Sequence, residues 1–205
     1  MGDLARGGLT RGDHQACAHA RGCQEKSLPC GIVAEDTGQL RIICGSSYKT
    51  SDFIGDALEA RWEALHAPEK AAGALRQLTM DNGAESHGGR TQFLHRLVPF
   101  ADHIAQPSQL RYSPPYHSKD NPIERCWGLV ELHWHGTQLI EVETMLEWAT
   151  SMTWKGLQLA VELSQQVYQK GIALGKRAMR EIEKRLERHP PLPKWDILIR
   201  PASAL

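Results

Sequence analysis

The sequence lacks several features that would place this chain outside the class of globular proteins. No run of about eighteen apolar residues occurs, so no membrane-spanning helix is expected. The N-terminus has no apolar signal core, which favours a cytoplasmic protein over a secreted one. Lysine and arginine (24) balance aspartate and glutamate (24), so no overall basic excess points to nucleic acid.

The cysteines also lack the spacing of a structural framework. There are 5, an odd number without a small-scaffold pattern, which indicates reduced thiols. The N-terminal set of His14, Cys17, His19, Cys23 and Cys30 does not pair Cys-x₂₋₄-Cys with His-x₃₋₅-His, as structural zinc sites do. We therefore expect no zinc site there.

Hydrophobic periodicity and turn residues predict an α/β protein. The expected elements are strands over 28–34 and 39–44 joined as a hairpin, a helix over 53–65 capped by Ser51-Asp52, a strand over 75–80, a helix over 89–103, a strand over 109–113 and a helix over 121–133. Beyond Glu141 the pattern predicts only helices, over 141–150, 157–174 and 176–188. This divides the chain into a loop-like segment 1–27, an α/β domain 28–135 and a helical extension 136–205.

Two carboxylates lie where rigid elements end or begin. Asp81 follows the strand over 75–80, and Glu124 lies in the first turn of the helix over 121–133. Asp120 or Asn121 can cap that helix, and Pro122 suits the first helical position. Rigidly held carboxylates are the ligands of two-metal phosphoryl transfer, in which divalent ions activate the attacking and leaving oxygens.

A purely structural interpretation of the same residues stays open. Asp81-Asn82-Gly83 is also a good turn sequence, in which Gly83 can adopt positive φ. Glu124 is favoured in a first helical turn by the helix dipole alone. On this view the chain is a metal-free structural domain.

Three motifs carry a resemblance to a known family. Asp81-Asn82-Gly83, Pro114-Pro115-Tyr116-His117-Ser118 and the stretch from Asn121 to Trp127 resemble the second and third acidic motifs of DDE transposases of bacterial insertion sequences. The chain most resembles the ISAzo-type (Rhodopirellula-type) transposase family. The segments 50–54, 90–93 and 152–156 are also similar, and the likeness runs from about Arg6 to Ile197.

The resemblance implies an RNase H-like mixed sheet flanked by helices, with a C-terminal helical extension. It implies cleavage and strand transfer of insertion-sequence ends, that is, DNA transposition and recombination of a mobile element. Asp81 and Glu124 would then be the second and third metal-binding acids, with two Mg²⁺ or Mn²⁺ ions in the intact enzyme. The expected partners are DNA and a second copy of the chain, and the enzyme would associate with the nucleoid when acting.

The first acid of the family pattern is missing. In the family it lies on the first strand, upstream of a stretch that resembles Ala5-Arg6-Gly7-Gly8, so the acid and its strand would precede Met1. Asp3 and Asp13 are the nearby substitutes, and neither lies in a strand-like run. We expect an N-terminally truncated chain without the family's N-terminal DNA-binding helices, inactive as written. The alternative to an active transposase is thus an inactive remnant that at most binds DNA weakly or oligomerises.

Several further residues have a functional and a structural interpretation. His117, Lys119 and Arg125 flank Glu124 and would contact DNA phosphates, or else lie in solvent or in surface ion pairs. Trp127 is expected to anchor the Glu124 helix in the core. The basic residues over 176–188 alternate with glutamates, which is typical of a solvated helix face, with contact to the DNA backbone as the alternative.

Overall fold

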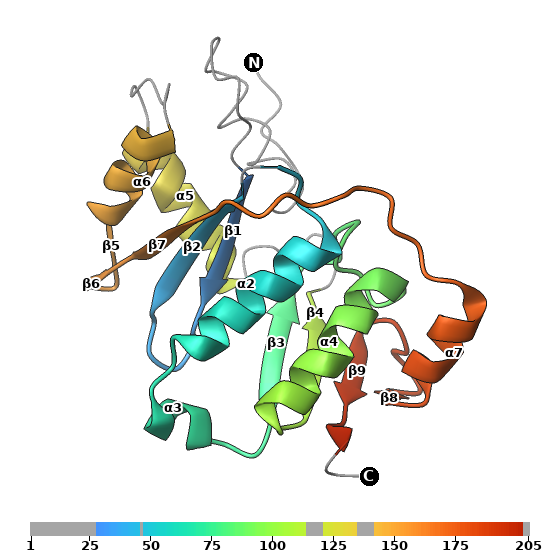
Figure 1. Cartoon of the computed structure of the whole chain (residues 1–205). Helices are drawn as coiled ribbons and strands as arrows, with labels where there is room; N and C mark the ends of the chain where they lie inside the picture. The colour runs from blue at the N-terminus through green and yellow to red at the C-terminus, as the bar shows by residue number, and fades with distance from the viewer. Residues whose placement is uncertain (1–27, 46, 114–120, 135–141, 203–205) are drawn as a thin grey trace. The chain divides into compact units, whose positions relative to one another are not determined.

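The computed structural model describes residues 28–45, 47–113, 121–134 and 142–202 (Figure 1). The chain forms two compact units, which we describe separately. The first contains Met1–Lys49 and His117–Tyr168, and the second contains Thr50–Tyr116 and Gln169–Leu205. Within the described ranges, no helix has the length and apolar character needed to cross a membrane.

The first unit is organised around a three-stranded sheet of order β1-β2-β7. Strands β1 (Leu28–Val33) and β2 (Leu40–Gly45) form the predicted antiparallel hairpin. The N–H of Gly38 donates to the Ala34 carbonyl at 2.8 Å, and Gly38 has a φ of 75°. Glycine adopts this conformation without a steric cost, so the turn explains the residue found there.

Strand β7 (Ala160–Ser164) pairs in parallel with β2, so the helix predicted over 157–174 is wrong. The apolar residues here lie at positions 157, 159, 161 and 163, a period of two that is typical of a strand. An ion pair between buried Arg41 of β2 and Glu162 joins the two strands. Beyond β7, the described residues up to Gly175 contain no helix.

Two helices and a small hairpin complete the first unit: α5 (Pro122–Trp134), α6 (Val142–Thr150), β5 (Thr153–Trp154) and β6 (Leu157–Gln158). The core forms where one face of β2 meets one stripe of α5. Its buried residues are Leu40, Ile42 and Cys44, spaced by two, and Ile123, Cys126 and Val130, spaced by three and four, together with Met152 and Leu159. These spacings place each set on a single face of its element.

The second unit contains a four-stranded sheet of order β3-β4-β9-β8. Its strands are β3 (Arg76–Met80), β4 (Ser108–Tyr112), β8 (Leu186–Arg188) and β9 (Asp196–Ile199). β3 and β4 are parallel, whereas β9 is antiparallel to both β4 and β8. Leu110, Ile197 and Ile199 are each 0% exposed, so the core of this unit lies against β4 and β9.

The C-terminal strands correct the expectation of an all-helical extension. Helix α7 (Lys176–Glu183) does begin where the sequence predicts, but it ends five residues earlier, and β8 follows. The alternation of Asp196 and Leu198 with buried Ile197 and Ile199 explains β9. β8 and β9 are therefore part of the sheet that contains β3.

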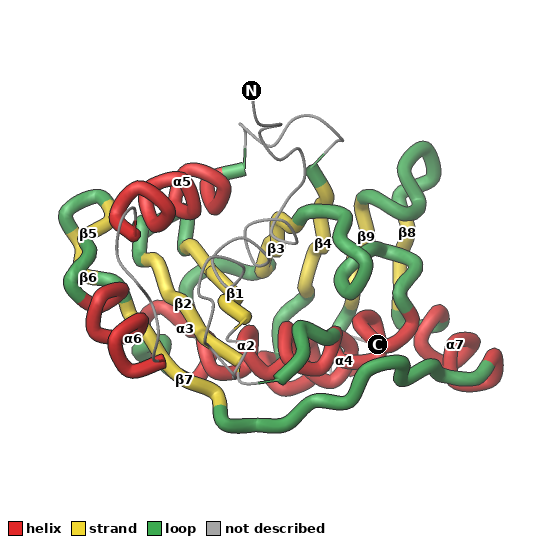
Figure 2. The backbone as a smooth tube through the Cα atoms, turned by 90° about the horizontal axis from the view of Figure 1, so that it is seen from above, coloured by secondary structure: helices red, strands yellow, loops and turns green. Residues whose placement is uncertain are grey.

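Helices α2 (Ser51–Glu63) and α4 (Thr91–Ile104) lie side by side over one face of this sheet (Figures 1 and 2). Thr50 caps α2 by accepting the Phe53 N–H at 3.2 Å, one residue before the predicted cap. The short helix α3 (Ala67–Ala71) follows α2. Helix α4 buries the predicted residues Phe93, Leu94, Leu97 and Phe100.

Candidate functional site

Asp81 directly follows strand β3, as the sequence predicts. The N–H of Ser113 donates to the Met80 carbonyl at 3.0 Å, so the pairing of β3 with β4 continues up to the residue before Asp81. Asp81 itself is half-buried. A carboxylate attached to a paired strand has little backbone freedom, which is what a metal ligand requires.

The chain turns back toward Asp81 over residues 83–87. The Gly83 carbonyl accepts the N–H groups of Ser86 at 3.3 Å and His87 at 3.0 Å, and the Ser86 hydroxyl donates to the Asp81 carbonyl at 3.3 Å. Gly83 does not use the positive φ that is open to it on the structural interpretation. A Cβ on Gly83 would lie 3.3 Å from Ser86 Oγ, and at ordinary contact distances of 3.7 and 3.8 Å from the two carboxylate oxygens of Asp81. The closest contact of Gly83 is therefore with the turn itself, which agrees with the structural interpretation of this glycine.

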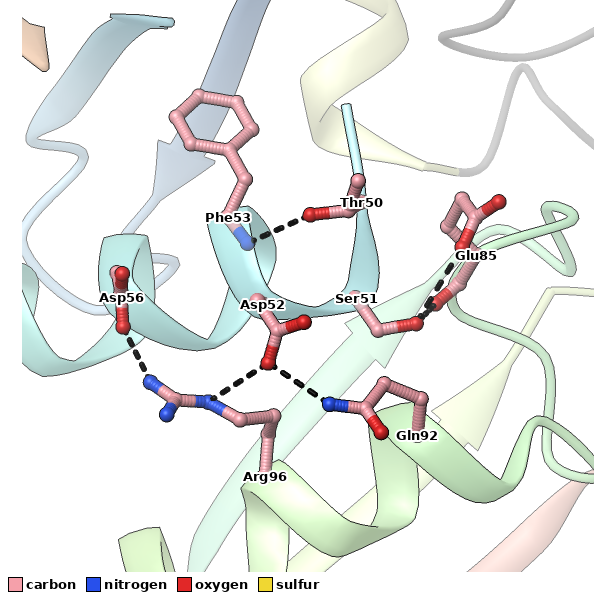
Figure 3. A network of polar contacts seen from close by, with 8 residues as sticks. All are labelled: Thr50, Ser51, Asp52, Phe53, Asp56, Glu85, Gln92 and Arg96. Atoms are coloured by element: carbon pink, nitrogen blue, oxygen red, sulfur yellow. Dashed lines mark hydrogen bonds and ion pairs between the residues drawn. The ribbon is translucent and has the colours of Figure 1, made fainter. Parts of the chain in front are cut away.

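The N-terminus of α2 contacts the segment that follows Asp81. The Ser51 hydroxyl donates to the Glu85 carbonyl at 2.7 Å, and Figure 3 shows it pointing toward this residue. The Glu85 carboxylate in turn forms an ion pair with Arg90 at 3.0 Å. Because Ser51 is 1% exposed, its hydrogen bond is shielded from competing water.

A second set of contacts joins α2 to α4 (Figure 3). The Asp52 carboxylate accepts a hydrogen bond from the Gln92 side chain at 2.9 Å and lies 3.8 Å from Arg96, which also pairs with Asp56. A Cβ on Gly55 would lie 2.8 Å from Arg96 Nε, so the helices approach closely at this glycine. Asp52 and Gln92 belong to the family-like segments 50–54 and 90–93, so these two segments are brought together. Their contacts fix α2 against α4.

A buried tyrosine lies beneath the turn. The Tyr112 hydroxyl donates to the Ser86 carbonyl at 2.5 Å, and both residues are buried. Burial raises the pKa of the Tyr112 phenol above its usual range, Arg188 opposes that rise and the Asp81 carboxylate adds to it. The phenol therefore stays protonated and keeps its donor role. Sequence reasoning missed Tyr112 and Arg188 because neither belongs to an acidic motif.

Glu124 lies in the first turn of α5 and is half-buried. The Asn121 side-chain oxygen accepts the Ile123 N–H at 3.4 Å, and its carbonyl accepts the Glu124 N–H at 3.1 Å. Of the two predicted caps, Asn121 is confirmed, whereas Asp120 lies outside the described residues. The capped first turn fixes the backbone from which Glu124 projects.

The Glu124 helix is anchored on strand β1. A Cβ on Gly31 would lie 2.8 Å from Trp127 Cζ2 and 2.9 Å from Ile123 Cδ1, so α5 packs directly on the glycine backbone. Trp127 packs against the core of this unit, which confirms its predicted anchoring role. Glu124 thus belongs to a helix whose position relative to β1 is fixed.

The two candidate acids belong to different units, Asp81 to the second and Glu124 to the first. Carboxylate oxygens are the ligands that Mg²⁺ prefers, so both residues suit a divalent ion by their chemistry. Among the described residues, no group of three or more His, Cys, Asp or Glu side chains is arranged to hold a metal.

Some of the remaining predicted residues lie within the described ranges and others lie outside them. Arg125 is exposed on α5, next to Glu124. Cys30, from the N-terminal set of cysteines and histidines, is buried in β1. Outside the described ranges lie His117, Lys119, Asp3 and Asp13, together with the other members of the N-terminal set, His14, Cys17, His19 and Cys23.

Comparison with known proteins gives one result. The model of the family described as the Rhodopirellula transposase DDE domain matches residues 1–201. No curated protein and no solved structure matches the chain.

Proposed function

Since the chain belongs to the Rhodopirellula transposase DDE domain family, which matches residues 1–201, we propose that Asp81 and Glu124 supply carboxylates for DNA cleavage and strand transfer. One observation carries this proposal: each acid projects from a fixed backbone. Asp81 follows a paired strand, and Glu124 lies in the capped first turn of a packed helix. Rigid placement of carboxylates is the protein's main contribution to metal-assisted phosphoryl transfer.

The family uses divalent metal ions, and the two acids fit Mg²⁺ or Mn²⁺. Two bound ions would activate an attacking water or 3′-hydroxyl and neutralise charge on the leaving oxygen. The protein's part would be to supply the two carboxylates, Asp81 from the end of β3 and Glu124 from the start of α5. Hydrolysis would free a 3′-hydroxyl at the element end, and that hydroxyl would then attack target DNA.

Arg125 is the described residue best suited to contact the DNA backbone beside the site. It is exposed and follows Glu124 directly on α5. His117 and Lys119 are proposed for the same role on sequence grounds. Cationic side chains that contact phosphates fix the register of DNA and give binding that weakens with salt. An Arg125→Ala variant should therefore bind DNA more weakly and reduce the salt slope by about one unit.

The order of the long elements supports the proposed RNase H-like fold. From β1 to α5 the chain runs strand, strand, helix, strand, helix, strand, helix, with the short α3 inserted after the first helix. The acids follow the third strand and begin the last helix of this series. We further propose that the active form is an oligomer that acts on DNA in the cytoplasm.

The test is divalent-ion-dependent cleavage of DNA that carries the element ends, using the full chain. Asp81→Asn and Glu124→Gln keep side-chain size and remove charge, and each should abolish cleavage. Glu131→Gln is the matched control because Glu131 is exposed on the same helix as Glu124. Cleavage that survives either active-site substitution would contradict the proposed roles.

A second candidate function is a domain that binds DNA or a second copy of the chain without cutting. It is favoured by the strand edges: among the described residues, β1 pairs only with β2 and β3 only with β4. Within the described ranges, one edge of β1 and one edge of β3 therefore have no partner strand, and such edges are the surfaces on which a further strand can pair. The same assay separates the candidates, because a folded chain that binds the DNA ends and never cleaves them would support the second.

A further inference from the structure

The loop that follows Asp81, residues 82–90, is held by side chains from three different elements. The carbonyls of Glu85, Ser86 and Gly88 each accept a hydrogen bond. The donors are Ser51 of α2 at 2.7 Å, Tyr112 of β4 at 2.5 Å and Arg188 of β8 at 2.9 Å. These three side chains therefore fix one short stretch of backbone in addition to the turn's own hydrogen bonds.

Arg188 is itself fixed in place. Its Nε and Nη2 donate to the two carboxylate oxygens of Glu183 at 3.0 and 2.7 Å. The remaining Nη1 donates to the Gly88 and Pro193 carbonyls, the latter at 2.8 Å. This bidentate contact with Glu183 sets the plane of the Arg188 guanidinium, so Nη1 is directed at the Gly88 carbonyl of the loop.

Gly88 is closely packed against the segment between β8 and β9. Gly88 is buried, and a Cβ placed on it would lie 2.2 Å from the Lys194 carbonyl oxygen and 2.9 Å from Ile197 Cδ1. The backbone of the loop therefore touches the segment between β8 and β9 directly. Any shift of this segment must move Gly88, which lies only seven residues after Asp81.

We propose that Arg188 is a positioning residue for Asp81: it fixes the loop through the Gly88 carbonyl and thereby sets the direction of the Asp81 carboxylate. The proposal rests on the function proposed above, in which Asp81 is a metal ligand. Arg188 touches neither metal nor DNA in this account. Removal of a hydrogen bond made directly to a metal ligand lowers metal affinity about 10- to 100-fold. Arg188 acts one step further from the ligand, through the backbone of the loop, so we expect an effect at the lower end of that range.

The experiment measures Mn²⁺ binding by the full chain from the electron paramagnetic resonance signal of free Mn²⁺. Amide hydrogen exchange over residues 82–90 is followed in the same samples. The variants are Asp81→Asn, Arg188→Met and Arg188→Lys. The matched control is Arg200→Met, since Arg200 pairs with exposed Glu187 outside the loop.

We expect Arg188→Met to weaken Mn²⁺ binding by about 10-fold and to speed exchange over 82–90. Arg188→Lys should recover part of the affinity, whereas Arg200→Met should match the parent chain in both measurements. Tyr112→Phe removes a single hydroxyl and should give a smaller effect of the same kind, which keeps the test valid if Arg188→Met fails to fold.

Two different failures are distinguishable. If Asp81→Asn loses Mn²⁺ binding while Arg188→Met and Tyr112→Phe bind like the parent chain, the positioning role is overturned and the metal role of Asp81 stands. If Asp81→Asn binds Mn²⁺ like the parent chain, the proposed metal site is overturned. Amide exchange over residues 82–90 tests separately whether Arg188 holds the loop. Unchanged exchange in Arg188→Met would overturn the claim that Arg188 fixes the loop backbone.

Discussion

Replacing Ile197 by alanine should strongly destabilise the second unit. Ile197 lies on β9, between β4 and β8, and is 0% exposed. The substitution removes three carbon atoms from the core, which costs about 2.4 kcal/mol at about 0.8 kcal/mol per buried methylene. The cavity left behind adds to this, so the expected loss is about 3–4 kcal/mol.

The assay is native-state amide hydrogen exchange, because a chain of two units need not unfold in one step. Peptides from α4 and β4 report on the second unit, and peptides from the β1-β2 hairpin report on the first. Leu192→Ala is the matched control: it removes the same number of carbons from a residue that is 49% exposed, and it should cost no more than about 0.5 kcal/mol. If Ile197→Ala lowered protection of α4 and β4 no more than this control does, β9 would not be part of the core.

Three further predictions concern other parts of the chain. Gly31→Ala should cost the first unit about 1–3 kcal/mol, because its Cβ would lie 2.8 Å from an indole carbon of α5. Gly128→Ala, with nothing within 4 Å, should instead stabilise by up to about 1 kcal/mol, and urea titration of both variants tests the contrast. The hydrogen bond from Arg185 holds the pKa of the Asp102 carboxyl below its usual range, so its stabilisation is present above about pH 4 and is lost as the pH falls further. Asp102→Asn should lose that part of the acid dependence in denaturant titrations at stepped pH. Burial raises the pKa of the Cys126 thiol to about 11, so iodoacetamide should label it far more slowly in the native than in the unfolded protein, and an equal rate by mass spectrometry would refute its burial.

The sequence predicts the first part of the chain well because the signals there are local. The hairpin of β1 and β2, the apolar stripe of α4 and the cap of α5 each follow from a few neighbouring residues. Asp81 and Glu124 were placed at element ends for the same reason. Their joint role as metal ligands remains a prediction, since they belong to separate units.

The C-terminal part was harder to predict because its strands are short. β8 spans Leu186–Arg188, too few residues to show a period, and it follows directly on a helix rich in charge. The alternation around β7 is present in the sequence, although the pattern over 157–174 as a whole predicts a helix. The contacts of the loop after Asp81 cannot be predicted from the sequence. Tyr112 and Arg188 are separated from the loop residues that they contact by 26 and 100 residues.

The most direct test of the account asks whether Asp81 and Glu124 share one metal site. Fe²⁺ can replace Mg²⁺ on oxygen ligands, and with ascorbate and peroxide it cuts the nearby peptide backbone. The account predicts cuts close to residue 81 and close to residue 124 in the same preparation, with both lost in Asp81→Asn and in Glu124→Gln. Cuts at only one position, or cuts that persist in either variant, would contradict the claim that the two carboxylates form one site.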